Sequence, residues 1–161
     1  MLRKNVVVCL VLVILSVPPD LRALEPVAQL LPDDWDQGGG VWFGRSIAMD
    51  GDVVVVGSHQ DNWPDPPGNT MGAGAVYVFR RTGGTWKQEA KLYVDPPTEG
   101  EHFGYTVAVK GEVLLASTYY TEGEVPAPGK VYVFRRVAGV WTQEGALSPS
   151  ISLDDDRFGL R

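Results

Sequence analysis

Cysteine is nearly absent from this sequence. Its only copy, Cys9, lies in an apolar stretch near the N-terminus, among valines and too early to be a lipoprotein attachment site. A single thiol cannot form an intramolecular disulfide, and removal of this stretch would leave a chain without any thiol. The fold must therefore be stabilised by packing alone.

Long apolar runs are also missing. The longest, residues 6–17, has 12 apolar or near-apolar residues, whereas a membrane-spanning helix needs about 20. Two basic residues precede this run, two prolines follow it, and Ala23 offers a small residue for cleavage. This arrangement predicts a signal peptide over residues 1–23 and a secreted or cell-surface protein with no stable membrane span after cleavage. An uncleaved anchor is the alternative, because Leu21 fits poorly two positions before the cleavage residue.

Basic residues are scarce relative to acidic ones. Removal of residues 1–23 takes three basic residues from 14 and one acidic residue from 20, which leaves 11 against 19 and a formal charge of −8. An acidic surface repels phosphate backbones, which argues against nucleic acid as a partner.

The motifs of common active sites are missing as well. There is no Gly-x-Ser-x-Gly elbow, and the two histidines, His59 and His102, fall in different loops, where we predict surface positions. The sequence therefore predicts no catalytic residue and no cofactor.

What the sequence does contain is a repeat. The segment AVYVFRRTGGTWKQEAKL at residues 75–92 returns as KVYVFRRVAGVWTQEGAL at residues 130–147, an offset of 55 residues. Phe-Gly pairs beginning at Phe43, Phe103 and Phe158 are spaced 60 and then 55 residues apart. Self-similarity at this period indicates one supersecondary unit used repeatedly.

Each unit predicts four short strands. The run Val53 to Val56 is apolar without interruption, which is typical of a strand covered on both faces, and Asp50-Gly51 before it predicts a tight hairpin turn. From Trp86 to Leu92 apolar and charged residues alternate, which predicts an outermost strand with one apolar face. The expected strands are 43–49, 53–58, 75–80 and 86–92 in the first unit, and 103–109, 113–118, 131–136 and 141–147 in the second.

Antiparallel four-stranded units with two apolar faces are typical of propeller blades. The predicted fold is therefore all-β: a partial β-propeller with two complete four-stranded antiparallel blades. Val27 to Leu30 resembles Glu89 to Leu92, so we also expect an orphan N-terminal outer strand. The third Phe-Gly pair predicts the start of a third blade.

The units resemble the FG-GAP repeat, the blade of integrin α-subunit propellers and of many secreted bacterial proteins. Phe-Gly-x-Ser/Thr, Val-Val-Gly-Ser, Gly-Ala-Val-Tyr-Val-Phe and Trp with Lys-Leu follow in this order, although residues 116–118 read Ala-Ser-Thr where Gly-Ala-Pro is typical. The resemblance covers residues 43–147 and restarts at residues 156–159, which implies two complete repeats and the start of a truncated third. The expected division is a signal peptide at 1–23, the lead-in at 24–42, repeats at 43–102 and 103–157, and the start of a third repeat at 158–161.

Blades of this family often bind calcium in a loop resembling Asp-x-Asn-x-Asp-Gly-x-x-Asp between their first two strands. Here that loop is reduced to Asp50-Gly51-Asp52 in one unit and Lys110-Gly111-Glu112 in the other. Calcium usually takes about six to eight oxygen ligands. We therefore predict that neither hairpin binds calcium, and we assign no metal site.

The long loop at residues 59–74 is the best candidate for ligand binding. Its prolines stiffen the chain, and a stiff loop with an aromatic tip loses less entropy on binding. The simpler interpretation is that the tryptophan folds back onto its own blade. The candidate ligand-binding residues are Asp61, Asn62, Trp63 and Asp65.

Two functions from different classes fit these features. The first is a secreted or cell-surface binding or adhesion module for an extracellular protein or glycan, with no catalysis of its own. The second is an N-terminal fragment of a propeller enzyme, such as a sialidase-type hydrolase or a quinoprotein dehydrogenase, whose catalytic residues lie in other blades. Because two stacked blades leave two apolar faces open, we also expect a truncated chain that self-associates through those faces.

Overall fold

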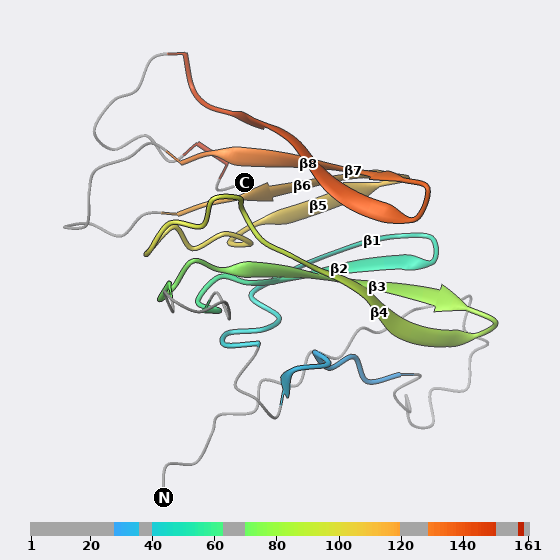
Figure 1. Ribbon diagram of the computed structural model, residues 1–161. Helices are drawn as coiled ribbons and strands as arrows, with labels where there is room; N and C mark the ends of the chain where they lie inside the picture. Colours follow the sequence, from blue (N-terminus) through green and yellow to red (C-terminus); the bar gives the residue numbers. More distant parts are fainter. Residues whose placement is uncertain (1–27, 36–39, 63–69, 120–128, 151–157, 160–161) are drawn as a thin grey trace, which may run out of the picture.

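The computed structural model describes residues 28–35, 40–62, 70–119, 129–150 and 158–159 (Figure 1). All eight named elements in these ranges are β-strands, which confirms the all-β prediction. The strands are β1 (Ser46–Asp50), β2 (Val53–Ser58), β3 (Ala75–Thr82), β4 (Thr85–Leu92), β5 (Val107–Lys110), β6 (Val113–Ser117), β7 (Val131–Val137) and β8 (Val140–Leu147).

The strands form two antiparallel sheets of four, as the repeat predicts. Sheet 1 has the order β1-β2-β3-β4 and sheet 2 the order β5-β6-β7-β8. The first strand of each sheet begins later than expected, at Ser46 and Val107. Gly44 and Gly104 have φ angles of 91° and 86°, so each Phe-Gly pair forms a turn ahead of the strand.

The outermost strands each contain a β-bulge that the sequence pattern did not reveal. In β4, Ala90 pairs with Val78 but Gln88 pairs with Phe79, so Glu89 is the extra residue. A bulge interrupts the alternation of side chains between the two faces of a strand. The prediction of one continuous apolar face from Trp86 to Leu92 is therefore wrong, since these two ends pack into different clusters.

Each sheet has two faces of different character. The leading face of sheet 1 carries Val54, Val56, Tyr77, Phe79 and Trp86. Its trailing face carries Val53, Val55, Val76, Val78 and Leu92. Aromatic side chains are thus confined to the leading face, and the trailing face is aliphatic.

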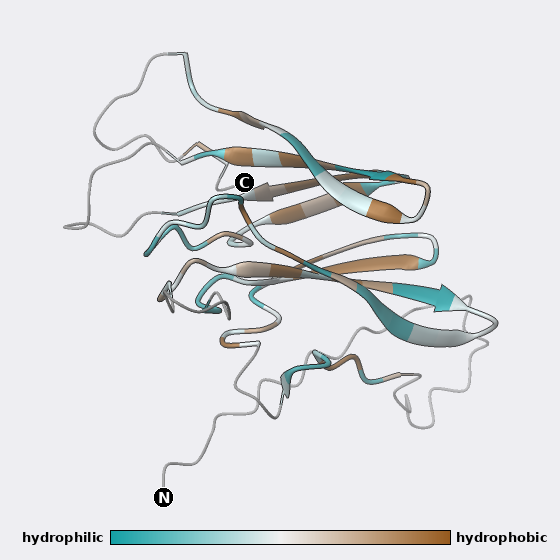
Figure 2. Ribbon diagram, in the orientation of Figure 1, coloured by the Kyte–Doolittle hydropathy of each residue, from teal (hydrophilic) through white to brown (hydrophobic). Residues whose placement is uncertain are grey.

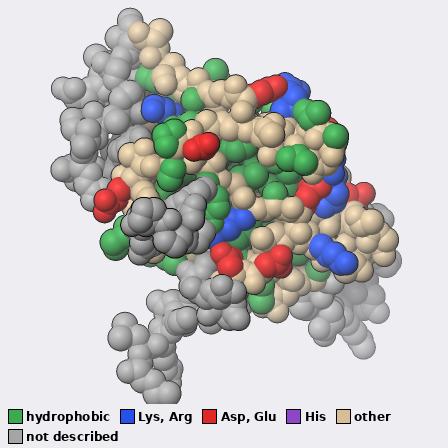
Figure 3. All heavy atoms as spheres, viewed as in Figure 1, with side chains coloured by type: hydrophobic (Ala, Val, Ile, Leu, Met, Phe, Trp, Pro, Cys, Tyr) green, Lys and Arg blue, Asp and Glu red, His purple; other side chains and the backbone are tan. Residues whose placement is uncertain are grey.

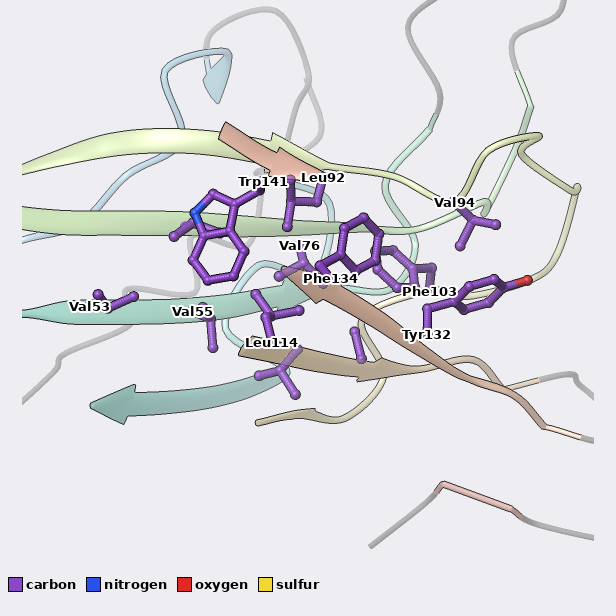
Figure 4. Close-up of a cluster of buried hydrophobic side chains, with 13 residues drawn as sticks. Val53, Val55, Val76, Leu92, Val94, Phe103, Leu114, Tyr132, Phe134 and Trp141 are labelled. Carbon is purple, nitrogen blue, oxygen red and sulfur yellow. The ribbon is translucent and has the colours of Figure 1, made fainter. Parts of the chain in front are cut away.

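The main core lies in the joint between the two sheets, where the trailing face of sheet 1 packs on the leading face of sheet 2 (Figure 4). Figure 2 shows hydrophobic strands facing one another in this joint, and hydrophilic residues toward the tip of the β3–β4 hairpin. Two glycines allow the close approach, because a Cβ atom on Gly57 would collide with the carbonyl oxygen of Gly104, and one on Gly74 with that of Phe103. Sheet 2 contributes Leu114, Ala116, Tyr132, Phe134 and Trp141 to the joint.

Residues 28–30 do not form the expected outer strand, and in Figure 1 this segment lies below sheet 1. Leu30 packs against the leading face of sheet 1, as Leu92 of the trailing face of sheet 1 packs against the leading face of sheet 2. The backbone N–H of Asp33 donates to Gln88 at 3.0 Å, which matches the bond from Asp95 to Gln143. Residues 30–33 thus stand where the end of a preceding fourth strand would stand, and no strand among the described residues pairs with them.

The third Phe-Gly pair lies against sheet 2 as the second lies against sheet 1. A Cβ atom on Gly129 would collide with the carbonyl oxygen of Phe158. Gly159 has a φ angle of 84°, close to the 86° of Gly104. The trailing face of sheet 2 thus has a Phe-Gly turn at one end.

Candidate functional site

The structure places Asp61, the first predicted ligand residue, inside the protein. Its carboxylate accepts a hydrogen bond from the Tyr77 hydroxyl at 2.5 Å and from the backbone N–H of Gly40 at 3.0 Å. The ammonium of Lys91 lies 3.2 Å away. Asp61 therefore holds the start of the long loop onto sheet 1.

A polar network surrounds Asp61 and also holds the N-terminal segment. Lys91 forms an ion pair with Asp34 at 2.5 Å and lies over the rings of Tyr77 and Tyr93, at 4.9 and 5.2 Å from their centroids. Burial alone would lower the pKa of Lys91, but its bonds to Asp34 and Tyr93 and the charge of Asp61 raise the pKa above its ordinary value. Burial and the Asp61 charge raise the pKa of Tyr77 far above its ordinary range. Lys91 is thus cationic and Tyr77 protonated at neutral pH.

Of the other predicted ligand residues, the structure describes only Asn62. Asn62 accepts a hydrogen bond from the backbone N–H of Gly72 at 3.0 Å, which closes the base of the loop. Trp63 and Asp65 lie outside the described residues. A ligand-binding role for Asp61, Asn62, Trp63 and Asp65 stays a prediction.

The two histidines are buried and adjacent, so the surface positions expected for them are wrong. His59 and His102 are 8% and 9% exposed, and their ring centroids lie 5.8 Å apart. Burial lowers the pKa of His59 to about 4, and the charges of His102 and Arg45 act in the same direction. His59 is therefore neutral at neutral pH.

Beside the histidines, the two blades form an aromatic patch of Trp42, Arg45, Tyr105 and Tyr119. The guanidinium of Arg45 lies 4.5 Å above the Tyr105 ring and donates to its hydroxyl at 2.7 Å. Tyr105 stacks on Tyr119 with centroids 4.7 Å apart. Trp42 is 59% exposed and its ring lies 5.9 Å from that of His59.

A signal for this patch was present in the sequence. Trp42 and His102 both precede a Phe-Gly pair, and Arg45 and Tyr105 both follow one. Residues that flank the same turn in successive blades lie side by side when the blades stack. Trp, Tyr and Arg are also the residues most often found at the energetic centres of protein interfaces.

The β1–β2 and β5–β6 hairpins, which are too short for a calcium loop, are joined to each other by an ion pair. Asp50 accepts hydrogen bonds from Lys110 and from the backbone N–H of Gly111, both at 2.7 Å, and these bonds lower the pKa of Asp50. Acidic and basic side chains lie next to one another at this end of the sheets, on the right of Figure 3. In the part of the chain that is described, no three His, Cys, Asp or Glu side chains gather in a way that could hold a metal ion. The absence of calcium binding at the hairpins stays a prediction, which titration with calcium tests.

The described residues also contain no helix that is long and apolar enough to span a bilayer.

The comparison with known families agrees with the strand pattern. A model described as the FG-GAP repeat matches residues 26–79 and 86–134, which is more than half of the chain. The second match begins in β4 and ends in β7, so one sequence repeat supplies the last strand of one sheet and the first three strands of the next.

A search of curated proteins gives no match. FG-GAP repeats form propeller-type binding or adhesion modules, which are typically extracellular and generally non-catalytic. The matched segments include the Phe-Gly pair and the Val-Tyr-Val-Phe strand of both blades. The chain therefore belongs to the FG-GAP repeat family.

Proposed function

We propose that this chain is a secreted or cell-surface binding module that binds an extracellular protein or glycan through its aromatic patch, without catalysis of its own. The observation that carries the proposal is the exposed Trp42 beside the stacked pair of Arg45 and Tyr105. These side chains offer flat apolar faces with polar edges, which suit both sugar rings and protein side chains.

The backbone at Trp42 supports a binding role. Trp42 has a φ angle of 60°, a left-handed conformation that is uncommon for a residue with a side chain. The conformation costs about 1 kcal/mol or more and holds a large aromatic ring toward solvent. A ring that is already fixed loses less entropy when it binds a partner.

The long loop leaves the sheet beside the patch. Its first residue, His59, contacts the rings of Trp42 and Tyr105, at 5.9 and 5.4 Å between centroids. Asp61 and Asn62 fix the base of the loop to the fold. In this proposal Trp63 and Asp65, which follow directly in the sequence, also take part in binding.

Secretion is part of the proposal and rests on two supports. The predicted signal peptide at residues 1–23 directs export, and the family is typically extracellular. Detection of the processed chain outside producing cells, with a new N-terminus at residue 24, is the expected result. A chain that stays in the cytoplasm would contradict it.

Binding is tested on a printed glycan array and on an array of extracellular-matrix proteins. We expect the full chain to bind a specific subset, and Trp42→Ala and Arg45→Ala each to weaken that binding by at least about tenfold, because interface Trp and Arg residues contribute most of the affinity. Lys87→Ala and Val140→Ala, exposed at other sites, are the matched controls. No specific binding to either array, or binding unchanged by both patch variants, would overturn the proposal.

A further inference from the structure

The joint between the two sheets contains a polar clamp centred on Glu89. This residue is the bulge residue of β4 and its side chain is 15% exposed. It accepts hydrogen bonds from Arg136 at 2.7 and 2.9 Å and from the indole N–H of Trp141 at 3.1 Å. Arg80, on its own sheet, donates at 2.9 Å. Hydrogen bonds that involve a charged group are about twice as strong as neutral ones, so the clamp binds sheet 2 to sheet 1.

Each clamp residue has an equivalent 55 residues away in the repeat. Glu144 is the bulge residue of β8 and corresponds to Glu89. Arg81 and Trp86 of sheet 1 correspond to Arg136 and Trp141 of sheet 2. The molecule thus carries the acceptor of a second clamp, Glu144, on sheet 2 and the two donors, Arg81 and Trp86, on sheet 1.

These equivalents are available for a further contact. The Glu144 side chain is 45% exposed and, among the described residues, accepts only from Arg135 at 2.6 Å. Arg81 pairs with Asp52 of its own sheet. Its equivalent Arg136 pairs with Glu112 of its own sheet and donates to Glu89 of the other sheet at the same time, so an ion pair within one sheet does not prevent the second contact. In the part of the chain that is described, the indole N–H of Trp86 has no acceptor.

The apolar parts of the two outer faces match as the clamp residues do. Leu147 is 53% exposed on the trailing face of sheet 2, whereas its equivalent Leu92 is 7% exposed in the joint. Val131 and Val133 are partly exposed where their equivalents in sheet 1 are fully buried. In this structure the trailing face of sheet 1 is covered by the aromatic leading face of sheet 2. The leading face of sheet 1 has the same residue types and could cover the trailing face of sheet 2 in the same way.

We propose that the trailing face of sheet 2 binds the leading face of sheet 1 in a second copy of this chain, with Glu144 accepting hydrogen bonds from Arg81 and Trp86 of that copy. The occupant is a second copy because the chain itself carries the complementary charge and the complementary apolar face. The contact joins different faces of two identical molecules, so it is heterologous and adds copies in one direction.

Two segments of the chain now lie where the second copy would dock. Leu30 occupies the place that Leu147 of a neighbouring copy would take, and Phe158-Gly159 occupies the place of a neighbouring Phe43-Gly44. Leu30 and Phe158-Gly159 are exchanged for their equivalents in the repeat, as in domain swapping, whereas the bonds of Asp34 to Lys91 and Tyr77 are lost. Coverage of the open trailing face of sheet 2 and completion of the clamp at Glu144 offset this loss.

The test uses sedimentation of the full chain over a range of concentrations. We expect the wild-type chain to form assemblies that grow with concentration. Glu144→Gln removes the acceptor charge and Arg81→Gln removes a donor charge, and each is expected to weaken association by about 30-fold or more, as for one partner of a buried charge pair. Lys87→Gln, on the exposed side of β4, is the control and is expected to behave as the wild type does.

Mixing the two variants separates this contact from any other mode of aggregation. The Glu144→Gln chain keeps an intact leading face, and the Arg81→Gln chain keeps an intact trailing face. At a concentration at which each variant alone is monomeric, equal amounts of the two should form one-to-one dimers that do not grow. A monomeric wild type, unchanged association of both variants, or a mixture without dimers would overturn the proposal.

Discussion

Sheets 1 and 2 have similar residues at equivalent positions, most closely in their third and fourth strands, but very different surroundings. Sheet 1 lies between sheet 2 on one side and the segment at residues 28–35 on the other, and its two central strands are almost wholly buried. Sheet 2 is packed on its leading face, while β8 is exposed along most of its length. The comparison shows that burial in a stacked repeat is set by the neighbours of a unit as much as by its own sequence.

The difference in character between the faces explains how one repeat can supply both sides of a joint. Aromatic side chains on the leading face meet valine and leucine on the trailing face, so a large and a small residue type interdigitate across the joint. Because every unit carries both faces, each sheet can bind the unit before it and the unit after it.

The largest expected difference between the sheets is in the stability that is lost on substitution of Val78 or of its equivalent Val133. Val78→Asp places an unpaired carboxylate in the fully buried joint and should lower the free energy of unfolding by about 4 kcal/mol or more. Val133 lies on the open face, so Val133→Asp should lower the free energy of unfolding by less than about 1.5 kcal/mol. Chemical denaturation of both variants at low protein concentration provides the comparison, and equal losses would show that the two trailing faces are equally covered.

The clamp residues give the next largest contrast. Glu89→Gln keeps the shape of the side chain but removes the charge that three donor side chains share, and should cost about 2 kcal/mol or more. Glu144→Gln removes one exposed ion pair and should cost less than about 1 kcal/mol in the monomer. Thermal unfolding at low concentration measures both, and a larger loss at Glu144 than at Glu89 would contradict the assignment of Glu89 to the joint.

Acid should destabilise the junction of the blades through His59. Its pKa is about 4 in the folded protein because of burial, against an ordinary value of 6.5. The unfolded chain therefore binds the proton more readily, so the stability from neutral His59 is complete above pH 6.5 and is lost as the pH falls toward 4. We expect His59→Gln to flatten the dependence of unfolding free energy on pH in this window, and His102→Gln to keep the larger part of the His59 contribution, which is due to burial. An unchanged slope in the His59 variant would count against a buried neutral imidazole.

The repeat made much of this fold predictable, because strand order and pairing depend on patterns within one unit. The glycine turns and the unbroken valine run gave β1 to β3 to within a few residues. The bulge at Glu89 was not predictable, because the alternation of residues in β4 looks regular in the sequence. The adjacent histidines and the aromatic patch depend on contacts between units, and these become visible only when the residues flanking each Phe-Gly pair are placed in neighbouring blades.

The smallest expected effect on stability, at Trp42, also bears most directly on function. Trp42 and His102 occupy equivalent positions with φ angles of 60° and 50°, which favour glycine in both cases. Trp42→Gly relieves the backbone strain and loses only an exposed ring, so the free energy of unfolding should rise by up to about 1 kcal/mol. His102→Gly relieves the same strain but removes a buried ring whose Nδ1 lies 3.1 Å from the carbonyl oxygen of His59, and should lower stability by about 1–3 kcal/mol. If Trp42→Gly gains stability and loses binding on the arrays, then the strain at Trp42 is maintained for binding, whereas a loss of stability would mean that Trp42 is instead a packing residue of the blade junction.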